Sequence, residues 1–431
     1  MTSFPIAKKY LIIAIVLFLT FDTVAQSLDS NLTPSQPTCS ICQQHIKPIQ
    51  LNQSIHLAAN YLLNNCDETG KFTYRINTNP NISINNKYNL LRHAGSLYAL
   101  TMYEQRYPNG KTRYTLVRGA QFLHQMIAPL SIPQDILAVW SDPKITGSNS
   151  PLQAKLGGTG LGLVALASIE PIKPGTTPLK TLKKMGHFLL FMQKEDGSFS
   201  SKYVPSQGGK NDKWTSLYYP GEAALGLLML YEQDPSPLWI TGAVKALTYL
   251  AKIRAGKKIV EADHWALLAT SKLLQINNRD LTQLKSIEKS TLLQHARQVA
   301  ESILATKAKL PKTSIKYGSF MADGRTTPTA TRLEGLLATL TFLPQENKLL
   351  RDRITTAVTE GLSFLLQTQI RVGKYAGGMP RAIVPTFPAQ YSSVNKSFSP
   401  RATEVRIDYV QHALSAMIQF EQLFYHTSED D

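Results

Sequence analysis

Apolar residues recur at steps of three and four along most of the chain, whereas the strict alternation that is typical of strands is scarce. Clusters of glycine, proline and asparagine, such as Pro108-Asn109-Gly110 and Asp234-Pro235, separate the periodic segments. The pattern predicts twelve helices, near residues 53–65, 89–106, 113–127, 152–169, 177–194, 218–233, 237–254, 262–276, 288–306, 328–343, 348–368 and 403–424. Twelve helices in succession make six helical hairpins.

The second helix of each predicted hairpin begins with a polar or glycine-rich element and continues with small and apolar residues. Examples are Arg92-His93-Ala94-Gly95, Gly157-Gly158-Thr159-Gly160 and Leu333-Glu334-Gly335. Helices with so much glycine and alanine and so little charge are buried on all sides. We therefore predict an all-α fold, an (α/α)6 toroid with these six helices inside and the other six outside, in one domain over residues 52–424.

A glycine turn followed by an aromatic residue comes after three of the predicted outer helices. It appears as Gly70-Lys71-Phe72, Gly197-Ser198-Phe199 and Gly373-Lys374-Tyr375, and two of these helices end in glutamine. The motif resembles the repeat signature of the terpenoid cyclase and protein prenyltransferase toroids. The hairpin scheme is also similar to that of the six-hairpin glycosidases and of toroidal polysaccharide lyases and epimerases. The resemblance covers residues 52–424 and implies architecture, because a fold does not determine an activity.

Polar residues at the starts of the inner helices are the candidate chemistry. In such a ring these helix starts point to one end, so residues far apart in sequence are expected to line one cavity, and buried charges there must pair or face water. The candidates for catalysis are Glu222, Glu334, Asp263, Asp408, His93, His412 and Tyr409. The candidates for substrate binding are Arg92, Tyr219, His264, Trp265, Arg332 and Arg406.

These residue types suit two reactions on a glycan. A glycosidase needs two carboxyl groups across the scissile bond, for which Glu222 and Glu334 are candidates on non-adjacent inner helices. A lyase or epimerase acting on a uronic acid needs a base, an acid and a cation that neutralises the substrate carboxylate. A histidine such as His412, Tyr409 and an arginine such as Arg332 are of those types.

Two further interpretations remain open at this stage. The charged residues also suit structural ion pairs, which would leave a non-catalytic toroid that binds a glycan or a protein. A terpenoid cyclase or prenyltransferase is a third hypothesis, but the Asp-x-Asp-Asp motif is absent from the sequence and zinc ligands are not recognisable. The Cys-Gly-Glu-Gln thioester motif of complement-type toroids is absent as well. No cofactor and no metal are expected.

The first 25 residues have the pattern of a signal peptide. Lys8 and Lys9 precede the apolar run Tyr10–Phe21, and Thr23-Val24-Ala25 supplies small residues before a cleavage site at Gln26. The run is shorter than the roughly 20 residues of a spanning helix, although an uncleaved anchor is the alternative. We expect an exported protein, periplasmic or secreted.

Residues 26–51 are rich in polar residues and proline and predict a flexible lead-in, and residues 425–431 form an acidic tail. Cys39 and Cys42 are candidates for a disulfide in an oxidising compartment. The formal charge of +16 favours an anionic partner such as an acidic polysaccharide, with association with the cell envelope as a further expectation. No nucleic-acid motif is present, so nucleic acid is not an expected partner.

Overall fold

A computed structural model gives the fold of the segment Ser40–Asp431. The structure describes residues 46–425 except 86, 132, 134, 281–283 and 384–400. The predicted signal peptide, Cys39, Cys42 and nearly all of the acidic tail lie outside the described residues. Among the helices of the described ranges, none combines the length and the apolar character needed to cross a membrane.

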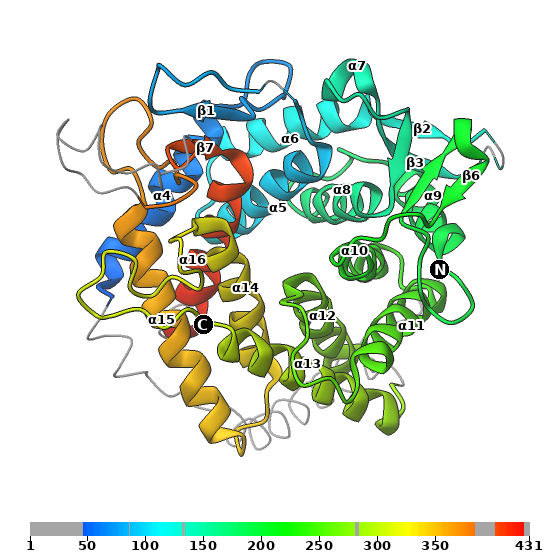
Figure 1. The fold of residues 1–431 in the computed structure, drawn as a ribbon. Coiled ribbons are helices and arrows are strands. Elements are labelled where there is room, and N and C mark those ends of the chain that lie inside the picture. The colour runs from blue at the N-terminus through cyan, green and yellow to red at the C-terminus, as the bar shows by residue number, and fades with distance from the viewer. Residues whose placement is uncertain are drawn as a thin grey trace, which may run out of the picture. The chain divides into compact units, whose positions relative to one another are not determined.

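Twelve long helices form two concentric rings, which confirms the predicted (α/α)6 toroid (Figure 1). The inner helices are α5 (Leu90–Arg106), α8 (Leu156–Ile169), α10 (Tyr219–Gln233), α12 (His264–Asp280), α14 (Thr326–Phe342) and α16 (Ile407–Phe424). Each packs against the next, and α16 packs against α5, so the inner ring is closed. The outer helices are α4 (Pro48–Asn64), α6 (Gly110–His124), α9 (Leu179–Met192), α11 (Pro237–Arg254), α13 (Ser286–Ala305) and α15 (Lys348–Thr368).

The burial of the inner helices follows their composition. Every residue of α8 is buried, and glycine and alanine allow neighbouring helices to pack against it on both sides. The first outer helix begins at Pro48, several residues before the predicted start, because proline is well accommodated in the first turn of a helix. The ring therefore includes residues that the sequence pattern assigned to the lead-in.

The connections at the two ends of the ring differ in length and structure. Connections from an inner helix to the next outer helix are short, such as residues 107–109 and 234–236. Connections from an outer helix to its inner partner are longer, such as residues 193–218, and contain all the strands of the described residues. Since these longer connections lead into the first turns of the inner helices, they lie at the end where those helices begin.

The strands of the described residues form two small sheets, which the sequence pattern did not predict because most of these strands have only three residues. β2 (Ile127–Pro129), β3 (Leu137–Ser141), β4 (Gln153–Lys155), β5 (Lys202–Val204) and β6 (Gly209–Asn211) form one antiparallel sheet in that order. β1 (Arg75–Asn77) pairs antiparallel with β7 (Glu404–Arg406), which joins the first hairpin to the last. The short helices α7 (Pro143–Thr146) and η1 (Pro205–Gln207) complete these connections.

The glycine turns after the outer helices have a common structural role. Gly70, Gly197, Gly318 and Gly377 all have a φ between 83° and 91°, and a Cβ on any of them would lie within 2.4 Å of a backbone carbonyl oxygen of another outer helix. The sequence pattern places the third glycine of the repeat at Gly373, but this residue has open space around it. Gly377 makes the backbone contact instead and is the repeat glycine. These turns hold successive hairpins together by direct contact between backbones.

We predict that Gly377→Ala destabilises the protein much more than Gly373→Ala. Both glycines have a positive φ, 86° and 82°, so both alanines carry the left-handed penalty of about 1–2 kcal/mol. Only the Cβ at position 377 would meet the Leu57 carbonyl oxygen, at 1.8 Å, and relieving that overlap should cost about 1–3 kcal/mol more. Chemical denaturation of both variants measures the difference, and equal free energies of unfolding would refute the role of the contact.

Candidate functional site

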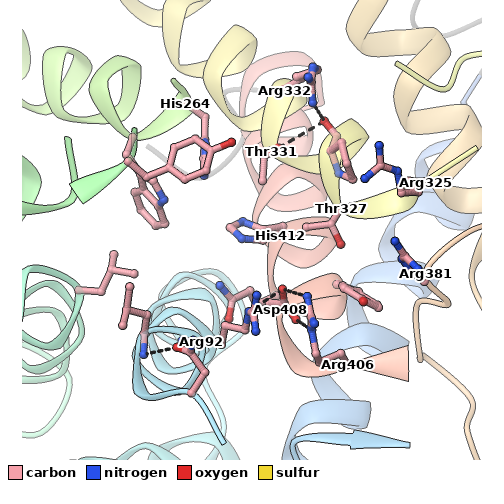
Figure 2. Close-up of a pocket in the computed structure, with 18 of the residues that line it drawn as sticks. Arg92, His264, Arg325, Thr327, Thr331, Arg332, Arg381, Arg406, Asp408 and His412 are labelled. Carbon is pink, nitrogen blue, oxygen red and sulfur yellow. Dashed lines mark hydrogen bonds and ion pairs between the residues drawn. The ribbon is translucent and has the colours of Figure 1, made fainter. Parts of the chain in front are cut away.

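A cavity of about 520 Å³ lies where the inner helices begin (Figure 2). Five of the six inner helices contribute residues from their first turns, and α8 contributes Leu161. The predicted residues that line the cavity are Arg92, Tyr219, Glu222, His264, Trp265, Arg332, Arg406, Asp408, Tyr409 and His412. The predicted convergence of distant residues at one end of the ring is therefore seen for these ten.

Asp408 is a buried carboxylate between two arginines. It accepts two hydrogen bonds from Arg406, at 2.5 and 2.9 Å, and forms an ion pair with Arg92 at 2.9 Å. Burial alone would raise the pKa of Asp408, but Arg92 and Arg406 outweigh burial and lower it. Arg92 also donates to the Tyr74 hydroxyl. This part of the wall is a closed ion-pair network around a carboxylate whose pKa lies below its ordinary value.

The cavity has more cationic than anionic groups. Its lining includes six arginines, Arg92, Arg325, Arg332, Arg381, Arg401 and Arg406, but only two carboxyl groups, Glu222 and Asp408. Arg332 donates to the Pro328 carbonyl of its own helix, and within the described ranges neither Arg332 nor Arg381 has a carboxylate partner. The starts of the inner helices add further positive potential. The cavity is therefore suited to an anionic ligand.

Glu222 is the second carboxyl group of the cavity, and its chemical state is different. Its side chain is almost completely buried, and Oε2 has no hydrogen-bond partner in the part of the chain that the structure describes. Burial and the charge of Asp263 raise the pKa of Glu222 to about 8, so the group is protonated at neutral pH. Space for this carboxyl exists because residue 157 is glycine: a Cβ there would lie 1.9 Å from Oε2.

His412 and Glu334 form a buried dyad behind the cavity surface. His412 Nδ1 lies 2.8 Å from Glu334 Oε2, and because a carboxylate accepts, Nδ1 carries the proton. Burial would lower the pKa of His412, but the Glu334 carboxylate outweighs it and raises the pKa. The other ring nitrogen, Nε2, has no hydrogen-bond partner in the described part of the chain. It is therefore available as a proton acceptor at the cavity.

His264 lies beside this dyad, with its ring centroid 5.5 Å from that of His412. Among the described residues, neither of its ring nitrogens has a hydrogen-bond partner. Burial, and to a smaller extent the charges of His412 and Arg332, lower the pKa of His264 well below 6.5. His264, Glu334 and His412 each offer one ligand atom within 4.8 Å of the others, a donor set that suits a divalent cation such as zinc. Because His412 and Glu334 are hydrogen-bonded to each other, the arrangement of these two groups does not require a bound metal.

Three predicted catalytic residues do not line the cavity. His93 follows Arg92 on α5 and therefore points about 100° away from it, toward the outer ring. Its Nε2 donates to the Gly119 carbonyl, and its Nδ1 accepts from the Tyr88 hydroxyl. The pKa of His93 falls to about 4 because the ring is fully buried. His93 connects α5 to α6, and its predicted place in the cavity is wrong.

Asp263 is also directed away from the cavity. It forms an ion pair with Arg254 of α11 at 2.7 Å and accepts from the Ala266 backbone N–H in the first turn of α12. Its role in the structure is that of a helix cap and an ion-pair partner. Glu334 lies two turns into α14, behind two cavity histidines: its Oε2 is 2.8 Å from His412 Nδ1 and 3.8 Å from His264 Nε2. It therefore does not stand across a substrate from Glu222 as predicted.

Several lining residues were missed by the sequence analysis. Arg325, Arg381 and Arg401 belong to the long connections that lead into α14 and α16. The order of the elements could have identified them. Connections from an outer helix to an inner helix end where the inner helices begin, so an arginine shortly before an inner helix is a candidate for the lining of the cavity. Arg325 directly precedes α14 and meets this criterion.

Comparison with known proteins identifies the fold. No protein-family model matches the chain, and no curated protein matches it. The solved cellobiose 2-epimerase from Spirochaeta thermophila superposes with a TM-score of 0.60 at 13% identity, covering 90% of this chain and 99% of that one. A D-mannose isomerase gives a TM-score of 0.55 at 12% identity, with coverages of 90% and 99%.

The α-1,6-mannanase GH76A from Salegentibacter sp. gives a TM-score of 0.55 at 13% identity and covers 86% of this chain and 99% of that one. An inactive variant of the same mannanase has been solved in complex with α-1,6-mannotriose. These neighbours are six-hairpin glycosidase-like α/α toroids, which confirms the architectural resemblance seen in the sequence. At these identities the likeness establishes the fold and not the reaction.

We predict that the free energy of unfolding of Glu222→Gln increases relative to that of the parent protein as the pH rises. Between pH 4.5 and about 8, folded Glu222 keeps its proton while the unfolded chain loses it. Stability is therefore lost as pH rises through this window, by roughly 1.4 kcal/mol per pH unit from this one group. Glutamine does not titrate, so the free energy of unfolding of the variant minus that of the parent should increase across the window.

Denaturant titrations at several pH values measure this difference. The matched control is Glu195→Gln, which changes an exposed carboxyl on the connection after α9 and should leave the pH slope unchanged. A parallel pH dependence for parent and Glu222→Gln would show that Glu222 is already ionised in the folded protein.

Proposed function

We propose that this protein is a carbohydrate-active enzyme that acts on an anionic glycan by proton transfer at the carbon next to a substrate carboxylate, as a lyase or an epimerase. The observation that carries the proposal is a base and an acid in one arginine-lined cavity. His412, supported by Glu334, offers the basic Nε2, and Glu222 is a carboxylic acid that keeps its proton at neutral pH.

The ring places these two groups on different walls. Glu222 belongs to α10 and His412 to α16, and two inner helices separate them in either direction around the ring. A sugar in the cavity would therefore meet the base on one face and the acid on another. Both an elimination and an epimerisation need this arrangement, since one group removes a proton and a different group supplies one.

The arginines supply the electrostatic part of the mechanism. Removing the proton next to a carboxylate places a second negative charge on that group, and guanidinium groups preorganised around it stabilise this charge. Arg332 and Arg381 are free of carboxylate partners within the described residues and are the candidates for this contact. In an elimination the electron pair would expel the neighbouring glycosidic oxygen, which takes the proton of Glu222. In an epimerisation a proton would return on the opposite face of the same carbon.

Hydrolysis is the second candidate, because a protonated, buried carboxyl such as Glu222 is also what a glycosidase uses as its acid. The other carboxyl of the lining, Asp408, has both oxygens occupied by arginines and is poorly placed to act as base or nucleophile. A hydrolase would need His412 to activate water. A toroid that only binds its ligand would not require an unpaired, protonated Glu222, which favours catalysis.

We predict that His412→Asn lowers turnover by about 10²–10⁴-fold, the usual contribution of a general base. Glu334→Gln should lower turnover as well, because Nδ1 loses its carboxylate acceptor. The assay incubates uronic-acid oligosaccharides with the protein in deuterium oxide and follows both exchange at the carbon beside the carboxylate and ultraviolet absorbance of an unsaturated product. A chelator serves as control, and full activity in its presence separates the histidine mechanism from a metal mechanism at the same three residues.

Several results would contradict the proton-transfer mechanism. Incorporation of heavy oxygen from labelled water into a new reducing end, without deuterium exchange, would establish hydrolysis instead. Unchanged turnover in His412→Asn, measured on a variant with parent-like thermal stability, would exclude His412 as the base. Activity should also fall above about pH 8, where Glu222 ionises, and this decline should be absent from any residual activity of Glu222→Gln.

Export belongs to the same proposal, since the basic residues and apolar run before Gln26 have the pattern of a cleaved signal peptide. We predict that N-terminal sequencing of protein from its native host begins near Gln26. Recovery of the chain with Met1 in place would exclude cleavage.

A further inference from the structure

A second feature of interest is a basic wall with an exposed tryptophan beside the cavity. Trp214 lies in the connection between β6 and α10, and 50% of its side chain is exposed. Its ring centroid is 5.6 Å from that of Tyr219, which lines the cavity. Trp214 is therefore next to the cavity but is not part of its lining.

Two lysines extend this wall from the cavity to Trp214. Lys155, the last residue before α8, is the cross-strand partner of Lys202, and it packs around Gly158 together with Leu91, the neighbour of Arg92. Burial, and then the charges of Lys202 and Arg92, lower the pKa of Lys155. Lys202 places its Nζ 4.7 Å from the centroid of the Trp214 ring. The charged groups thus follow one another from Arg92 in the cavity through Lys155 and Lys202 to Trp214.

The pairing of these lysines is unfavourable in the free protein. Lys155 and Lys202 are direct cross-strand partners in β4 and β5, and like charges in that position repel each other. In the described part of the chain neither has a carboxylate partner, whereas Lys194 nearby pairs with Asp212 at 2.7 Å. An anionic ligand lying across the two lysines would relieve this repulsion, and the exposed face of Trp214 suits the apolar face of a sugar ring.

The geometry points to an outer binding site, formed by Lys155, Lys202 and Trp214, that holds further units of the same acidic glycan whose reacting unit occupies the cavity. This inference rests on the proposed function for the identity of the ligand. It goes beyond it by assigning the substrate as an oligosaccharide or polysaccharide chain, not a single sugar or a disaccharide. Because the site adjoins the Tyr219 side of the cavity, the chain would leave the cavity between α8 and α10.

The test compares short and long ligands of the same chemistry. Di- and hexasaccharides of galacturonic, glucuronic and mannuronic acid, with maltohexaose as a neutral ligand of equal length, are titrated calorimetrically into the full protein. We expect at least one acidic hexasaccharide to bind about tenfold more tightly than its disaccharide, and maltohexaose to show no comparable affinity. Trp214→Ala should remove this gain, about tenfold, and leave disaccharide binding unchanged.

Two further variants make the test specific. Lys202→Gln should weaken hexasaccharide binding and reduce its dependence on salt. Tyr114→Ala, which removes another exposed aromatic side chain, on the outer helix α6, should change nothing. Equal affinities for di- and hexasaccharides, or equal losses in Trp214→Ala and Tyr114→Ala, would overturn the outer site.

The two proposals fail in different ways. Turnover of a disaccharide at the rate of a hexasaccharide, with no effect of Trp214→Ala, would leave the proposed reaction standing and remove the outer site. Tight, Trp214-dependent binding of a hexasaccharide without proton exchange or cleavage would support the outer site and contradict the enzyme. Absence of binding by every acidic saccharide would overturn both.

Discussion

Close contact between backbones is the constraint on which the rest of the structure depends. At Gly197 and Gly377 a turn after one outer helix touches a carbonyl oxygen of another, and at Gly160 one inner helix touches the backbone of the next. A single methyl group at these positions would overlap with atoms that belong to the main chain and cannot move aside cheaply. The ring therefore has a fixed diameter, and the side chains at its open end are held at fixed separations.

The cavity combines that fixed geometry with an unequal distribution of charge. Asp408 neutralises part of the positive charge, whereas Glu222 contributes none at neutral pH because burial keeps it protonated. Burial also keeps His264 neutral, whereas the Glu334 carboxylate raises the pKa of His412. The pKa values of four titratable groups around one cavity are thus shifted in different directions, which is the condition for acid and base chemistry in one site.

The sequence predicted the helices and their two-ring arrangement because both depend on local periodicity and on the small residues of the inner helices. It also predicted that polar residues at the starts of the inner helices line a cavity at one end of the ring. It did not predict the direction of individual side chains: Arg92 and His93 are neighbours, yet one faces the cavity and the other faces α6. A shift of one residue rotates a helical side chain by about 100°, and boundaries read from a pattern are uncertain by more than that. The arginines of the long connections lack periodicity altogether, so topology alone could have identified them.

The antiparallel pairing of β1 with β7 has a consequence for synthesis of the chain. Arg75 lies before the first inner helix and its partner Arg406 directly before the last, so all the hairpins between them must be synthesised before this pair can form. Until then the nascent chain is an open arc whose terminal hairpins expose apolar faces that the closed ring buries. Contacts of such sequence separation form slowly, and the unfinished arc is the species most exposed to aggregation and proteolysis. Chaperone dependence of this protein should therefore be greatest before the last hairpin of the ring has been synthesised.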